Sequence, residues 1–115
     1  MPRFLALYTA DKMSPPTPEL MQQMGALMER HKKAGKLVTT GGLKNRAADG
    51  LSVRVKNGQF NVVDVGPLWA SATGWAILEA PNRDQLIADV KEFLALAGDG
   101  VSEIIEISDM SQQQR

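Results

Sequence analysis

The chain has 115 residues, of which 43% are hydrophobic and 23% charged, the size and composition of one folded domain. Its 13 basic side chains balance 13 acidic ones, so the basic excess typical of nucleic-acid binding or cationic membrane attachment is missing. The absence of cysteine excludes disulfides, thiolate nucleophiles and cysteine-bound metals. We expect one cytoplasmic domain over residues 1–107, with a polar tail over residues 108–115, no cofactor and no metal.

The first half of the chain predicts a strand, a helix and a second strand. Phe4 to Thr9 has apolar residues on both faces, which is typical of a central strand. Thr17 is placed to cap a helix whose first turn contains Pro18, and Gly35 is a natural stop. The apolar stripe of this helix recurs at helical spacing, at Leu20, Met24, Leu27, Met28 and His31. A short strand follows at Leu37 to Thr40 and is ended by Gly41 and Gly42.

The clearest local signal lies between Ser52 and Val62. Apolar and polar residues alternate on both sides of Asn57-Gly58, the residue pair preferred in a two-residue type I′ turn. The turn sets a register in which Val55 faces Phe60 and Val53 faces Val62.

The second half repeats the strand–helix–strand pattern. Gly74 to Ala80 predicts a strand, and Asn82 predicts the cap of a second helix, with Gln85 in the reciprocal capping position. Gly98 ends that helix, and Val101 to Ile107 predicts the last strand.

The resulting order, β-α-β-β-β-β-α-β, indicates an α+β fold of the ferredoxin-like kind. It consists of an antiparallel sheet with two helices on one face, and a hairpin inserted between two β-α-β halves. A monomer of this size has no further element to cover the opposite face. We therefore expect a homodimer in which two sheets pair face to face.

Several segments resemble the YCII-related family, in particular the branch named after its Asp-Gly-Pro-Phe (DGPF) motif. Phe4 to Tyr8 is similar to the family's opening strand, and Ser52 to Gly58 is similar to its hairpin. Val65 to Leu68 stands where the DGPF motif is expected, and Gly74 to Leu78 where the branch has a Gly-Tyr-rich strand. The resemblance covers roughly residues 3–107. It implies a ferredoxin-like domain that pairs as a dimeric α/β barrel.

The sequence departs from the family pattern at two places. Val65 and Leu68 replace the Asp and Phe of the motif, so only Gly66-Pro67 remains. Met24 occupies the position of the histidine that the enzymatic branch carries inside the first helix. The His–Asp pair proposed for the family is therefore not implied here, and the resemblance bears on fold and dimerisation more than on activity.

Asp64 is the candidate catalytic residue. If the hairpin strand stays regular, Asp64 shares the face of Phe60 and Val62, opposite Leu51, where partial desolvation would raise its pKa toward that of a general acid or base. The alternative is that Asp64 caps the turn before Gly66-Pro67.

A ligand pocket is predicted beside Asp64, lined by Trp69, Tyr8, Leu51 and Phe60. Trp69 suits either a pocket or an interface, and Tyr8 either a pocket or the core. His31, the single histidine, is interpreted as a cation at a helix C-terminus, where the dipole favours it.

Three functions are compatible with these residues. The first is a dimeric domain that binds a small, partly apolar molecule between sheet and helices. The second is a cofactor-free lyase, isomerase or monooxygenase-type enzyme that uses Asp64 for proton transfer. The third is a regulatory protein-interaction module.

Overall fold

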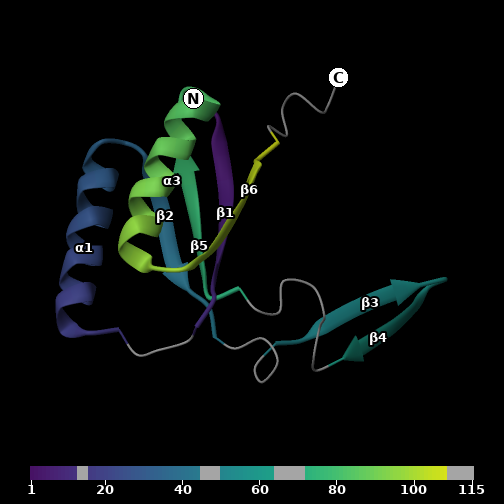
Figure 1. The fold of residues 1–115 in the computed structure, drawn as a ribbon. Coiled ribbons are helices and arrows are strands. Elements are labelled where there is room, and N and C mark those ends of the chain that lie inside the picture. The colour runs from purple at the N-terminus through teal and green to yellow at the C-terminus, as the bar shows by residue number, and fades with distance from the viewer. Residues whose placement is uncertain (13–15, 45–49, 64–71, 109–115) are drawn as a thin grey trace.

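The computed structural model describes residues 1–12, 16–44, 50–63 and 72–108 (Figure 1). The elements in these ranges, in chain order, are β1 (Arg3–Ala10), α1 (Pro18–Lys33), β2 (Leu37–Gly42), β3 (Ser52–Lys56), β4 (Gln59–Val63), β5 (Gly74–Glu79), α3 (Arg83–Ala97) and β6 (Gly100–Glu106). The protein is therefore α+β, and the predicted order of strands and helices is confirmed.

Four strands form the main sheet in the order β2-β5-β1-β6, and each neighbouring pair is antiparallel. The prediction that the first strand is central is confirmed, because β1 pairs with both β5 and β6. Both helices lie on the same face of this sheet (Figure 1). The arrangement is compatible with a ferredoxin-like fold.

The helix ends follow the predicted caps. Thr17 Oγ1 accepts a hydrogen bond from the Leu20 N–H at 3.1 Å, and Asn82 Oδ1 accepts one from the Gln85 N–H at 2.9 Å. The Gln85 side chain does not complete a capping box but donates to Asp89. Beyond α3, Gly98 adopts a φ of 99°, a conformation that side-chain-bearing residues rarely reach.

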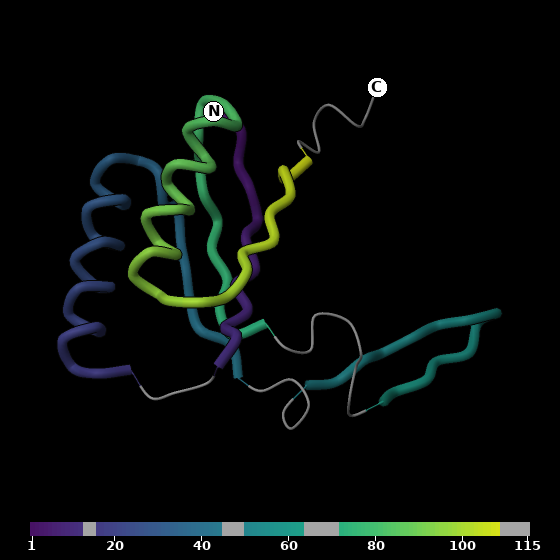
Figure 2. Tube along the Cα trace, viewed as in Figure 1, coloured from purple at the N-terminus to yellow at the C-terminus, as the bar shows by residue number. Residues whose placement is uncertain are grey.

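The hairpin has the predicted turn and register. Asn57 and Gly58 have φ values of 52° and 78°, the positive pair that a type I′ turn needs, and Val55 faces Phe60. Strands β3 and β4 nevertheless form a separate two-stranded sheet, which extends away from the main sheet and helices (Figure 2). The apolar side chains of the hairpin are consequently exposed.

Candidate functional site

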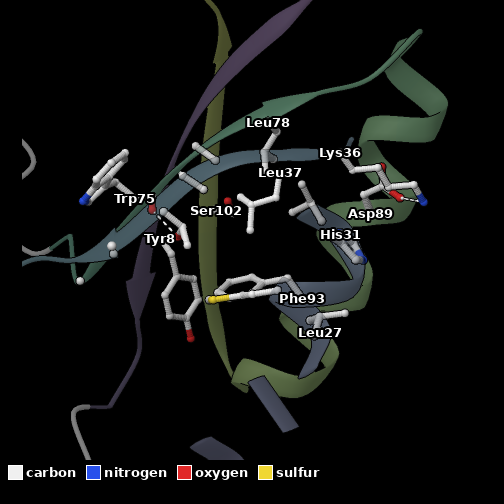
Figure 3. Close-up of a pocket in the computed structure, with 18 of the residues that line it drawn as sticks. Tyr8, Leu27, His31, Lys36, Leu37, Trp75, Leu78, Asp89, Phe93 and Ser102 are labelled. Atoms are coloured by element: carbon white, nitrogen blue, oxygen red, sulfur yellow. Dashed lines mark hydrogen bonds and ion pairs between the residues drawn. The ribbon is translucent and has the colours of Figure 1, made fainter. Parts of the chain in front are cut away.

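A cavity of about 510 Å³ lies between the main sheet and the two helices (Figure 3). Its size is within the range of about 300–1,000 Å³ that is usual for small-molecule sites. Most of its wall is apolar, and the larger apolar side chains include Leu27, Leu37, Leu78, Leu86, Val90 and Phe93. The cavity is therefore suited to a compact molecule with a largely apolar body.

Small residues on the sheet create this space. Ala6 of β1 and Ala76 of β5 are directly paired in the sheet and both line the cavity, as does Gly74 beside Tyr8. Directly paired residues of antiparallel strands point to the same face, so β1 and β5 present only the methyl groups of Ala6 and Ala76 to the helices at this position. The helices cannot approach further because large side chains, such as Phe93, meet the sheet around this centre (Figure 3).

Tyr8, for which the sequence left a pocket or the core open, lines the cavity. Its ring meets that of Phe93 edge to face, with the centroids 5.2 Å apart. Its hydroxyl donates a long hydrogen bond of 3.4 Å to the Gly98 carbonyl oxygen. Burial raises the pKa of Tyr8 above 10.0, and the carboxylates of Asp11 and Asp99 raise it further.

His31 lies in the last turn of α1, the helix end where the sequence placed it, but it also lines the cavity and is only 9% exposed. Its Nε2 lies 2.8 Å from Glu92 Oε1 of α3, and Arg30 Nη2 lies 2.6 Å from the other oxygen of the same carboxylate. The hydrogen bond with His31, together with the charge of Arg30, holds the pKa of Glu92 below its usual value. Glu92 is therefore ionised at neutral pH and accepts the hydrogen bond from the Nε2–H group of the ring.

A second polar cluster lies beside His31 at the same end of the cavity (Figure 3). Asp89 of α3 is only 8% exposed, and its Oδ1 accepts hydrogen bonds from Lys36 Nζ at 3.1 Å and from Gln85 Nε2 at 3.0 Å. Asp89 is a site residue that the sequence analysis did not identify. Its spacing from Leu86 and Phe93, at i+3 and i−4, could have identified it as a member of the buried stripe.

Two of the other predicted pocket residues, Leu51 and Phe60, lie outside the cavity. Leu51 precedes β3 and is 55% exposed, and Phe60 of β4 is 77% exposed; neither lines the cavity. The register placed Phe60 on the apolar face of the hairpin, but β3 and β4 do not join the main sheet, so this face does not meet the helices. Asp64 and Trp69 lie outside the described residues.

The described part of the chain holds no cluster of three or more His, Cys, Asp or Glu side chains arranged to bind a metal ion. None of its helices is long and apolar enough to cross a membrane.

The comparisons with known proteins give no identification. The sequence matches neither a protein-family model nor a curated protein.

Proposed function

We propose that this protein binds a small, largely apolar molecule in the cavity between its main sheet and the helices α1 and α3. The observation that carries the proposal is the cavity itself, which combines a mostly apolar wall with the polar side chains of His31, Lys36 and Asp89 at one end. The sequence led to the same proposal, but with a different set of lining residues.

The test is a screen for compounds that raise the melting temperature, because a ligand that binds only the native state stabilises it. Any compound found is then tested on Ala76→Leu, in which a larger side chain projects into the cavity from the sheet. We expect the variant to remain folded and to lose most of the ligand-induced shift.

Ala88→Leu is the matched control, because Ala88 is exposed on α3 and does not line the cavity. It should keep the full ligand-induced shift. An equal shift in wild type, Ala76→Leu and Ala88→Leu would place the ligand outside the cavity and contradict the proposal.

We also propose that the domain belongs to the YCII-related family and pairs as a dimeric α/β barrel. The dimer is supported by the apolar residues on the face of the main sheet opposite the helices. Leu5, Leu7 and Ile77 point to this face, because alternate strand residues point away from Ala6 and Ala76. Ile105, paired with Leu5, is 70% exposed on the same face, which a second sheet would cover.

A cofactor-free enzyme is the second candidate, and the His31–Glu92 pair favours it. A neutral imidazole that donates from Nε2 to Glu92 carries its lone pair on Nδ1 and is oriented by a carboxylate, the arrangement of many general bases. In this candidate function, Nδ1 takes a proton from the bound molecule, and Glu92 stabilises the imidazolium. His31→Gln would then abolish turnover but preserve binding, whereas a pure binder shows no turnover in either form.

A further inference from the structure

The polar end of the cavity contains a buried carboxylate with one oxygen unused by its neighbours. Both hydrogen bonds that Asp89 accepts from described residues, those from Lys36 and Gln85, end on Oδ1. None of the described residues has a side-chain nitrogen or oxygen that is both buried and without a partner. Oδ2 therefore reaches accessible space, and Asp89 lines the cavity.

His31 lies at the same end of the cavity. Its Nε2 is engaged by Glu92 at 2.8 Å, so Nδ1 is the ring nitrogen left for a bound molecule. Oδ2 of the Asp89 carboxylate accepts hydrogen bonds and cannot donate them. A bound molecule that forms a hydrogen bond with this oxygen must therefore supply the proton.

The charges at this end are paired. The ammonium of Lys36 lies 3.1 Å from Asp89, and the guanidinium of Arg30 lies 2.6 Å from Glu92. A ligand carboxylate would have to approach the carboxylate of Asp89, and a ligand ammonium would have to approach Lys36. A neutral head group avoids both repulsions and the large cost of burying an unpaired charge.

We propose that the cavity selects a neutral alcohol, an apolar body with a hydroxyl group that donates to Asp89 Oδ2. This inference rests on the proposed binding function and specifies the chemical class of its ligand. The apolar wall contacts the body of the molecule, and the polar end accepts a hydrogen bond from its hydroxyl group.

The test uses four compounds with one naphthalene skeleton: a naphthyl methyl ketone, the secondary alcohol formed by its reduction, the corresponding amine and the bare ethylnaphthalene. Their dissociation constants are measured by amide chemical-shift titration of the full chain at neutral pH. We expect the alcohol to bind at least about tenfold more tightly than the ketone, because a carboxylate facing a carbonyl oxygen stays unpaired. The amine should bind no more tightly than the alcohol.

Asp89→Asn tests the residue that makes the distinction. The amide keeps the size of the side chain and can still accept from Lys36 and Gln85 through its oxygen, while its NH2 group replaces Oδ2 as a donor. We expect the ratio of ketone to alcohol dissociation constants to fall from about ten to about one. Asp84→Asn, on the same helix but exposed and away from the cavity, should leave the ratio unchanged.

The possible outcomes distinguish a failure of the proposed alcohol selectivity from a failure of the proposed binding function. If the alcohol and the ketone bind equally to the wild type, the inference is overturned and the binding function stands. If none of the four compounds binds, both are overturned as stated. If Asp89→Asn does not fold, the wild-type ratio alone decides, because it needs no variant.

Discussion

His31 and Asp89 have ionisable side chains and yet occupy buried positions of their helices. Each is stabilised by a partner outside its own helix, His31 by Glu92 of α3 and Asp89 by Lys36, which precedes β2. Burial of such groups is tolerated only where a partner satisfies them. Helical spacing places both residues on the inner stripes, but the partners are 61 and 53 residues away. Their pairing therefore could not be derived from spacing.

Tyr8 offers a pH-dependent test at the same scale, since it is the only tyrosine of the chain. Because its pKa is raised in the folded state, the near-ultraviolet absorbance of the native protein should titrate with a midpoint above 10.0. The stability that the half-buried phenol contributes is fully present below pH 10.0, the unfolded value, and is lost as the pH rises through the folded pKa.

The urea-unfolded chain is the control and should titrate near pH 10.0, the ordinary value of tyrosine. In Tyr8→Phe, the loss of stability at alkaline pH should be smaller than in the wild type. A native midpoint at or below that of the unfolded chain would contradict the burial of the Tyr8 hydroxyl beside the cavity.

At the scale of elements, Gly100 lies where two strands approach closely, whereas Gly25 lies where there is free space for a side chain. A Cβ on Gly100 of β6 would lie 2.5 Å from the Thr9 carbonyl oxygen and 2.9 Å from the Tyr8 hydroxyl. The first contact is with backbone, which cannot move aside without parting β6 from β1. A Cβ on Gly25 of α1 meets nothing within 4 Å.

Matched Gly→Ala substitutions at these two sites should change stability in opposite directions. Gly100→Ala should lower the free energy of unfolding by about 1–3 kcal/mol through overpacking. Gly25→Ala should raise it by roughly 0.5–1 kcal/mol, because alanine is the better residue in a helix interior. Urea denaturation measures both, and an unchanged stability of Gly100→Ala would show that β6 does not pack against β1 as described.

At the scale of the whole molecule, the described helices α1 and α3 lie on one face of the main sheet (Figure 1). The proposed dimer predicts that Ile105→Lys yields a monomer, because a charge on the apolar face that pairs would be buried without a partner. Light scattering during size exclusion measures the mass. The residue is 70% exposed in the single chain, so the substitution should leave the fold of each protomer intact.

Met21→Lys serves as the comparison, since Met21 is 61% exposed but lies on α1, away from the sheet. It should elute as the wild type does. A wild-type protein that is monomeric at micromolar concentration would contradict the dimer.

The sequence by itself determined where the helices, strands and the hairpin turn lie, because local interactions along the chain decide these elements. Each of these signals involves residues within a few positions of each other, as in the caps at Thr17 and Asn82 and the turn at Asn57-Gly58. They can therefore be predicted without knowledge of the fold. The order of strands and helices followed from the same signals.

The tertiary structure alone decided the site. The cavity exists because Ala6 is paired with Ala76 in the sheet. His31 and Asp89 lie at one end of it because α1, β2 and α3 come together there. The direction in which the hairpin leaves the sheet likewise decided that Phe60 does not join the wall. These are contacts between residues far apart in the chain, and hydrophobic periodicity specifies which face is buried but not what it is buried against.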